Sequence, residues 1–314
     1  MSKSVKPLQI GSVTIPNSLI LAPMAGYTDL AMRRLCALSG AGLTVTEMVS
    51  AKGLVYNPDK SGELLVYSPE EKIKSAQLFG HEPEFFERAL ENEKINEFDI
   101  IDINMGCPVP KIVKSGEGSA LMKNIPLAKK IVSACVKKSN GKPVTVKTRL
   151  GFNDGEFIAV EFCKAMEDAG AQAIAVHGRT RAMGYSGTSD IRAIEKVKES
   201  VSIPVIASGD ATESNAEQLL ERVDGLMIGR GALGNPQIFA RLLGKEWKLS
   251  LKETIFAHID FMFEAYGDRY TFVNMRKHLG FYLKGVSGQK ELKQKLFTIT
   301  GTQSLKEEID KSLR

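Results

Sequence analysis

Short apolar runs alternate with amphipathic stretches along the first three quarters of the chain. The runs are four or five residues long and have the continuous hydrophobicity of strands buried in a parallel sheet. They cover residues 19–22, 43–46, 75–79, 100–104, 144–148, 173–177, 205–208 and 225–228. Helical periodicity fills several of the intervals, at residues 128–138, 157–169, 191–199 and 215–222. The runs recur about every 30 residues, which is the length of one βα unit.

Eight such units predict an α/β fold, namely a (β/α)8 TIM barrel. An open doubly wound sheet has the same alternation of strands and helices, and apolar periodicity alone does not distinguish the two. We expect the barrel because the number and spacing of the strands suit closure.

The strand pattern fades after about Gly244. Helical patterns replace it at residues 251–267, 273–284, 290–298 and 304–313, with glycines between several of them. We therefore expect two domains: a catalytic barrel over residues 1–243 and a small helical domain over residues 244–314.

Composition limits where the protein works. Hydrophobic residues make up 43% of the 314 residues, which is enough for a large core. No apolar run approaches the roughly 20 residues that span a membrane, and residues 1–7 lack the apolar segment of a signal peptide. These observations predict a cytoplasmic protein with no membrane partner, and a monomer is the default expectation.

The four cysteines are widely separated. Cys36, Cys135 and Cys163 lie in helix-like segments and are interpreted as small core residues, whereas Cys107 follows an apolar run. No pair has CxxC spacing. The sequence therefore predicts neither a zinc site nor a disulfide framework, and no metal is expected.

The net charge of +5 is unevenly distributed. Residues 244–314 carry 13 Lys/Arg against 9 Asp/Glu, whereas the first 243 residues carry 29 against 28. A basic tail is compatible with a nucleic-acid partner. From charge alone, a solvated helical surface is the simpler interpretation.

Polar side chains follow the predicted strands at the end where a barrel carries its catalytic groups. The fourth strand leads to Asn104-Met-Gly-Cys-Pro108, which places a thiol in a turn fixed by Gly and Pro. Taken alone, this thiol could be a nucleophile, a metal ligand or a proton donor. The other strand ends lead to Pro23-Met24-Ala25, Gln77, Lys147 with Arg149, His177, Ser208-Gly209-Asp210 and Gly229-Arg230.

The loops after the seventh and eighth strands predict a phosphate site. Ser208-Gly-Asp210 and Gly229-Arg-Gly231 offer backbone N–H groups and an arginine fork, in the region where such barrels bind phosphate. The flat Pro-Met-Ala backbone after the first strand suits a large planar ring, which favours FMN over a sugar phosphate. Lys147 would then stabilise negative charge on the reduced flavin.

These segments resemble the motifs of the tRNA-dihydrouridine synthases, and most closely those of the bacterial B-type members. The similarity covers almost the whole chain in the family's order. Its most specific elements are Asn104-Met-Gly-Cys-Pro108 and His177-Gly-Arg-Thr-Arg181. Further matches are Ala22-Pro-Met-Ala-Gly26, Gln77, Gly118-Ser-Ala-Leu121, Val146-Lys-Thr-Arg149, Gly209-Asp210, Met227-Ile-Gly-Arg-Gly-Ala232 and Met275-Arg-Lys-His278.

The resemblance implies an FMN-dependent oxidoreductase that reduces the C5–C6 double bond of a D-loop uridine in tRNA. NADPH or NADH would reduce the flavin, hydride would pass to C6 of the uracil, and Cys107 would donate the proton to C5. A thiol with an ordinary pKa of about 8.5 is mostly protonated at neutral pH, as a general acid must be. Which tRNA uridine is reduced stays open.

The same resemblance implies the binding residues. The expected cofactor-binding residues are Pro23, Met24, Ala25, Gln77, Lys147, His177, Ser208, Gly209, Asp210, Gly229 and Arg230. The expected substrate-binding residues are Asn104, Arg179, Arg181, Arg276 and Lys277. The last two belong to the helical domain, which would contact the tRNA backbone. Ser208 departs from the Asn that is common in the family, which leaves a side-chain contact with FMN open.

Two other functions fit parts of this pattern. One is an FMN barrel that acts on a free pyrimidine, but a small substrate requires no basic helical tail. The other is a non-catalytic RNA-binding module on a degenerate barrel. The intact set of Cys107, Lys147 and Arg230 argues against degeneracy.

Overall fold

A computed structural model describes residues 5–313. Residues 1–4, part of the stretch inspected for a signal peptide, and Arg314 lie outside the described residues. Eight parallel strands follow one another in the order β4-β3-β11-β10-β9-β8-β7-β6, and pairing of β4 with β6 closes the circle. This confirms the predicted barrel.

Each predicted strand agrees with the structure to within one residue at either end. The strands are β3 (Leu19–Leu21), β4 (Leu43–Val45), β6 (Lys74–Phe79), β7 (Ile100–Asn104), β8 (Val144–Arg149), β9 (Ala173–His177), β10 (Val205–Ser208) and β11 (Gly225–Ile228). A two-residue strand, β5 (Val49–Ser50), pairs with the end of β6 and was not predicted.

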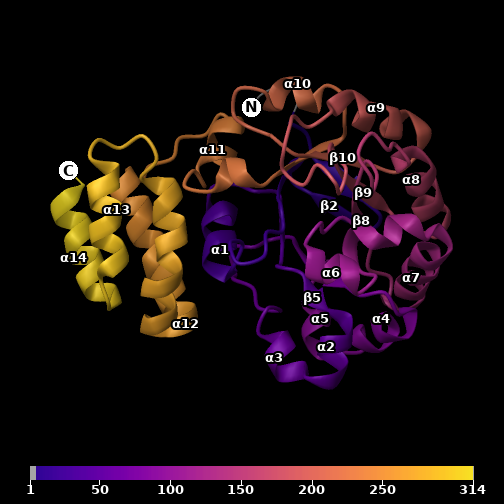
Figure 1. Ribbon diagram of the computed structural model, residues 1–314, viewed down its shortest axis with the longest axis horizontal. Coiled ribbons are helices and arrows are strands. Elements are labelled where there is room, and N and C mark those ends of the chain that lie inside the picture. Colours follow the sequence, from indigo (N-terminus) through magenta and orange to yellow (C-terminus); the bar gives the residue numbers. More distant parts are fainter. Residues whose placement is uncertain (1–4, 314) are drawn as a thin grey trace.

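Helices form a ring outside the strands (Figure 1). They are α1 (Leu30–Leu38), α2 (Ala51–Tyr56), α3 (Pro58–Gly62), α4 (Pro83–Ala89), α5 (Glu93–Asn96), α6 (Pro110–Lys114), η1 (Gly118–Lys123), α7 (Ile125–Lys138), α8 (Ala159–Asp168), α9 (Ile191–Ser200), α10 (Ala216–Leu220), η2 (Arg230–Ala232) and α11 (Ile238–Leu242). The main core lies between ring and strands. Cys36, Cys135 and Cys163 are buried in it as free thiols, which confirms their interpretation as core residues.

A hairpin that the sequence did not predict covers the amino-terminal end of the barrel. It consists of β1 (Leu8–Ile10) and β2 (Val13–Ile15) in antiparallel pairing. Its apolar side chains join the cluster inside the barrel. A Cβ at Gly225, at the start of β11, would lie 3.1 Å from the side chain of Leu8. Apolar side chains of the hairpin thus fill this end of the barrel.

Three helices follow the barrel: α12 (Leu251–Tyr282), α13 (Gln289–Thr298) and α14 (Thr302–Ser312). A capping box at Ser250 and Glu253 starts the first of them. The predicted helices 251–267 and 273–284 are parts of α12, which breaks at Gly267, with φ 75° and ψ 179°, and resumes at once. The three helices share a core of their own, although their independence as a domain stays a prediction.

Helix α12 packs against α1, so the helical unit stands at one side of the barrel (Figure 1). The backbone N–H of Leu30 donates to the hydroxyl of Tyr266 at 3.0 Å, and Arg34 pairs with Glu264 at 2.7 Å. Tyr27, which precedes α1, has an edge-to-face contact with His278, with ring centroids 5.9 Å apart. The loop after the first barrel strand therefore borders the helical unit directly.

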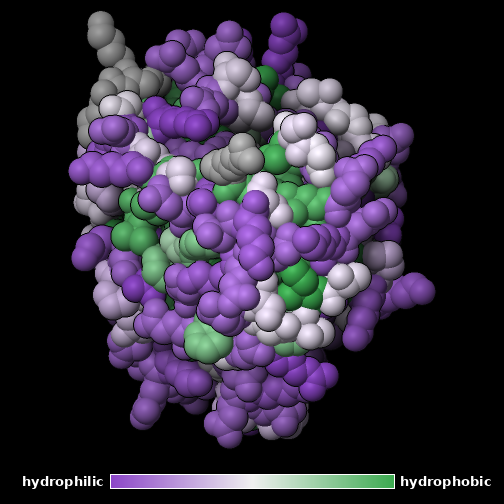
Figure 2. All heavy atoms as spheres, turned by 90° about the vertical axis from the view of Figure 1, so that its left-hand side faces the viewer, coloured by the Kyte–Doolittle hydropathy of each residue, from purple (hydrophilic) through white to green (hydrophobic). Residues whose placement is uncertain are grey.

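The outer face of the C-terminal helices is mostly hydrophilic, with small hydrophobic patches (Figure 2). Within residues 5–313, no helix has the length and apolar character that crossing a membrane requires.

Candidate active site

Neighbouring strands deliver several of the predicted residues to two successive levels near the carboxyl end of the barrel. The parallel register pairs Asn104 with Lys147, and it pairs His177 with both Arg149 and Ser208. All five side chains therefore belong to adjacent strands, as predicted from their positions at strand ends. Arg149 was noted in the sequence but was not assigned a role.

The loops after the first and last barrel strands meet beside them. Pro23, Met24 and Ala25 follow β3, while Gly229 and Arg230 follow β11, the strand that pairs with β3. A Cβ at Gly229 would lie 3.4 Å from the sulfur of Met24. The two segments predicted to contact opposite ends of a flavin are thus in contact range of each other.

The turn that carries Cys107 is held on three sides. The backbone N–H of Cys107 donates to Asn104 Oδ1 at 2.9 Å. The carbonyl of Cys107 accepts from the N–H and the hydroxyl of Ser119 at 3.1 and 2.9 Å. Arg149 Nε donates to the carbonyl of Gly106 at 2.8 Å. These bonds fix the thiol just past β7.

Cys107 is the partly exposed member of the four cysteines. Burial raises the pKa of its thiol, although the N–H of Val109 and the charges of Arg149 and Lys147 act in the opposite direction. The thiol is therefore protonated at neutral pH. Gly118 lies against it with φ +59°, and a Cβ there would come within 2.9 Å of the Cys107 Cβ.

A buried hydrogen-bonded chain lies below this turn. Asn104 Nδ2 donates to Gln77 Oε1 at 2.9 Å, and Gln77 Nε2 donates to Asp102 Oδ2 at 2.6 Å. The hydroxyl of Thr145 donates to Asp102 Oδ1 at 2.5 Å. Asp102 and Thr145 were not among the predicted site residues, although an acidic residue inside an apolar strand run is a signal for such a role.

These hydrogen bonds occupy much of the hydrogen-bonding capacity of Asn104 and Gln77, two of the predicted binding residues. Both lone pairs of Asn104 Oδ1 accept backbone N–H groups, from Gly106 and Cys107, and Asn104 Nδ2 faces Gln77 and Met48. Contacts of Asn104 with a base and of Gln77 with a flavin stay predictions. Such contacts would have to use the groups that this chain leaves free.

Lys147 is a partly buried cation. Burial, together with the charge of Arg149, lowers its pKa to about 8, while Asp102 and Cys107 act in the opposite direction. Within the described residues, no hydrogen bond or ion pair reaches its ammonium. A cation in this state stabilises an anionic group that binds beside it.

His177 is uncharged at neutral pH. Burial lowers its pKa to about 2, and the charges of Lys147, Arg149, Arg179 and Arg230 act in the same direction. Arg179 Nη1 lies 3.3 Å from His177 Nε2. Because a guanidinium only donates, Nε2 is the acceptor and Nδ1 carries the proton.

Asp210 holds two arginines beside the last strands. Its carboxylate accepts from Arg179 Nη2 at 2.5 Å, from Arg230 Nη2 at 2.9 Å and from the N–H of Ser189 at 2.9 Å. These partners lower the pKa of Asp210 against the effect of burial. An incoming anion would therefore meet Arg230 and backbone N–H groups, since the carboxylate faces the arginines.

The predicted substrate residue Arg179 is buried, and its guanidinium also donates to the carbonyls of Ser186 and Gly187. In this position it braces the loop after β9. Its contact with RNA stays a prediction, but the structure gives its guanidinium another task.

Gly209 and Tyr185 shape the same region. Gly209 has φ +108°, and a Cβ there would lie 2.7 Å from the ring of His177. Tyr185, which the sequence did not single out, is 61% exposed and lies under the guanidinium of Arg230, 5.1 Å from its ring centroid. The loop after β10 therefore needs glycine at position 209, and the exposed ring of Tyr185 lies beside it.

The other predicted substrate residues lie outside this group. Arg181 stacks over Phe152 at 4.9 Å, and Arg276 on α12 donates to the carbonyl of Ile299 at 3.3 Å. Lys277 faces the barrel, with its ammonium 5.6 Å from the ring centroid of Tyr27. Of these three, Lys277 thus lies against the loop after β3.

One group among the described residues has the donors that a divalent ion would need. Asp29, His258 and His278 are buried between barrel and helices, with ligand atoms within 4.8 Å of one another. Within residues 5–313, no hydrogen-bond partner reaches Asp29 Oδ2, His258 Nε2 or either nitrogen of His278. The ammonium of Lys277 acts electrostatically on all three residues, which disfavours a second cation there.

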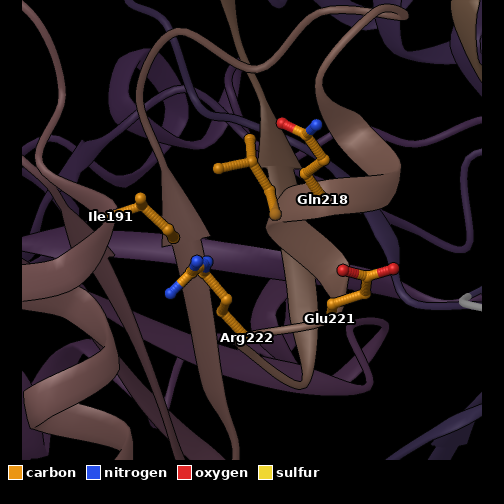
Figure 3. Close-up of a pocket in the computed structure, with 5 residues that line it drawn as sticks. Ile191, Gln218, Glu221 and Arg222 are labelled. Carbon is orange, nitrogen blue, oxygen red and sulfur yellow. The ribbon is translucent and has the colours of Figure 1, made fainter.

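A hollow on the outer ring is separate from the strand ends. Figure 3 shows it between α9 and α10, where Ile191, Gln218, Glu221 and Arg222 line it. It contains none of the predicted site residues.

Comparison with known proteins adds an independent finding. The family model described as "Dihydrouridine synthase (Dus)" matches residues 20–314. A "tRNA-dihydrouridine synthase B" of Shewanella oneidensis is 41% identical over an alignment 288 positions long, which covers 88% of this chain and 89% of that protein. A "Probable tRNA-dihydrouridine synthase 1" of Synechocystis is 38% identical over an alignment 321 positions long, which covers 98% of this chain and 90% of that protein.

Solved structures share the fold at low sequence identity. Morphinone reductase superimposes with a TM-score of 0.55 at 14% identity, over 77% of this chain and 91% of that chain. The old yellow enzyme of Trypanosoma cruzi gives 0.56 at 12% identity, over 79% and 93%. At these identities the likeness concerns the barrel fold alone.

The cost of burying Lys147 predicts a pH-dependent gain of stability on its removal. Its pKa is lowered from 10.5 to about 8 in the folded protein. Between these values the unfolded chain binds more protons, so the contribution of Lys147 to stability rises with pH. Without added cofactor, Lys147→Met should stabilise the protein at pH 7 by up to about 3 kcal/mol, and the gain should vanish near pH 10.5. Urea unfolding of both proteins across this range measures it, and a gain independent of pH contradicts the assignment.

Proposed function

This chain belongs to the dihydrouridine synthase family, and we propose that it is an FMN-dependent tRNA-dihydrouridine synthase. It reduces the C5–C6 double bond of a D-loop uridine with electrons from NADPH or NADH. The observation that carries the proposal is a protonated, partly exposed Cys107 in the turn after β7, next to strand β8, whose Lys147 has no ion-pair partner within residues 5–313.

The residues at the strand ends fit an anionic planar cofactor. Lys147 has a charge without an ion-pair partner among the described residues, and Gly209 and Gly229 leave the loops after β10 and β11 free of side-chain bulk. Arg230 is half exposed beside them. We assign the ring side to residues 23–25 and Lys147, and the phosphate side to Gly209 and Arg230. FMN held there would supply the hydride chemistry between NAD(P)H and C6 of the uracil.

Cys107 donates the proton that completes the reduction at C5. Burial keeps its thiol protonated at neutral pH, as a general acid requires. The nearby charges of Lys147 and Arg149 stabilise the thiolate that remains after the transfer. One proton at C5 and one hydride at C6 balance the saturation of the double bond. His177 is neutral and its Nε2 is occupied by Arg179, so it orients groups without supplying the proton.

The helical unit supplies the tRNA contacts in this proposal. Its basic side chains would bind phosphates without reading sequence, with Arg276 and Lys277 foremost and Arg181 nearer the strand ends. The target base must leave its stack to reach the barrel. The site of action would be the cytoplasm, and a monomer with a barrel over residues 1–243 and a helical domain over residues 244–314 suffices for it.

Reduction of a free pyrimidine by the same barrel is the alternative activity. The packing of α12 against α1 beside the loop after β3 favours RNA, because a small substrate needs no such arrangement. An RNA-binding module without catalysis is disfavoured by the intact arrangement around Cys107.

Removal of the Cys107 thiol should separate binding from chemistry. The purified protein should be yellow, with flavin absorbance at about 450 nm. Cys107→Ala should keep this absorbance and the affinity for tRNA but lose turnover by about 100-fold or more, because the proton donor is gone. Dihydrouridine formation, measured by mass spectrometry of digested tRNA, reports turnover, and Cys107→Ser is the size-matched control for packing. Near-normal turnover of Cys107→Ala would show that another acid acts.

Neutralising Arg276 should weaken tRNA binding without affecting flavin. Arg276→Gln removes one phosphate contact, so the salt dependence of binding should lose about one unit of slope. Lys252→Gln is the matched control, since the Lys252 ammonium is already paired with Asp310 at 3.0 Å. Binding titrations at several salt concentrations give both slopes. Equal slopes for the two variants would reject Arg276 as a phosphate contact.

A further inference from the structure

We propose that Asp102 is a positioning residue that sets the orientation of the Cys107 turn through Gln77 and Asn104. Its importance for turnover rests on the proposed function, whereas its effect on the turn does not. The residues come from β6 and β7, and Thr145 on β8 touches Asp102 from the other side.

Three bonds connect Asp102 to the backbone of Cys107. Gln77 Nε2 donates to Asp102 Oδ2 at 2.6 Å, and Asn104 Nδ2 donates to Gln77 Oε1 at 2.9 Å. The Cys107 N–H then donates to Asn104 Oδ1 at 2.9 Å. The chain is continuous from the barrel interior to the turn.

The two ends of the chain fix its direction. Oδ2 of Asp102 is an acceptor towards Gln77, and a proton on Oδ1 would not change this. If Gln77 and Asn104 both turned over, two oxygens would face each other at Asp102. At the other end, the Asn104 amide nitrogen would face the N–H groups of Gly106 and Cys107. The observed orientation therefore satisfies every link, and the reversed one breaks both ends.

Burial makes these links costly to lose. The exposed fractions are 1% for Gln77, 3% for Asp102, 8% for Asn104 and 7% for Thr145. Water cannot readily replace a lost partner at such positions, so an unpaired group costs its full desolvation. Without Asp102, nothing at the Asp102 end of these bonds fixes the orientation of the Gln77 amide, so Gln77 no longer holds Asn104 in one orientation.

Three variants separate this role from a general loss of buried polarity. Asp102→Val removes the acceptor for Gln77. Asp102→Asn keeps the orientation, because the amide oxygen can face Gln77 while its NH2 donates to Thr145. Thr145→Val introduces the same side chain on the opposite side of Asp102 and leaves the bond to Gln77 intact.

Hydrogen exchange at the Cys107 amide measures the effect without any catalytic assay. In the flavin-loaded protein, Asp102→Val should raise its exchange rate about tenfold relative to the Ile174 amide, a core reference in β9. Asp102→Asn and Thr145→Val should stay within about threefold of the wild type. Dividing the exchange rate of the Cys107 amide by that of the Ile174 amide corrects for a change in the overall stability of the variant. If Asp102→Val does not fold, Gln77→Met breaks the chain one link higher, and the same rise is expected.

An unchanged ratio in Asp102→Val, or an equal rise in Thr145→Val, overturns the positioning role. In tRNA reduction, Asp102→Val should also lower kcat by about tenfold or more while the KM for tRNA stays within about twofold, since the acid is misplaced rather than the substrate. A KM effect alone contradicts the role. If the wild type itself forms no dihydrouridine while the exchange ratio rises as expected, the proposed function fails and the positioning role stands.

Discussion

Closure of the barrel with one end sealed is the constraint on which the rest of the structure depends. The β1–β2 hairpin joins the apolar cluster inside the strands at their amino-terminal end. Near the carboxyl ends of the strands, Asn104 on β7 lies level with Lys147 on β8, and His177 on β9 lies level with Arg149, two residues further along β8. A buried polar group needs a partner. The hydrogen-bonded chain below Cys107 meets that need and makes the turn rigid.

The cations at the carboxyl end of the barrel are of two kinds, those paired with a carboxylate and those without such a partner within residues 5–313. Arg179 and Arg230 are paired with Asp210, which fixes the loops after β9 and β11. Lys147 is left without an ion-pair partner among the described residues, and burial lowers its pKa to about 8. Buried Arg179 holds the loops together, whereas half-exposed Arg230 and Lys147 can both face an anionic ligand. This division supports a reduced-flavin site better than a purely structural set of charges.

The sequence was sufficient for the barrel strands, because continuous apolar runs about 30 residues apart have few alternatives. It also located Cys107, Lys147 and His177 at strand ends. It missed Asp102 and Thr145, since a polar residue in an apolar run has no periodic signal to show that strands β7 and β8 place the two together. It could not show that Arg179 is buried, or that α12 continues past Gly267, because tertiary packing decides both.

The central claim is that this strand end reduces uridine in tRNA. Nucleotide-resolution mapping of dihydrouridine in tRNA tests it most directly, in cells that lack this protein and in the same cells supplied with the wild type or with Cys107→Ala. We expect loss of dihydrouridine at a D-loop position, recovery with the wild type and no recovery with Cys107→Ala. Unchanged dihydrouridine at every tRNA position in the deficient cells would contradict it.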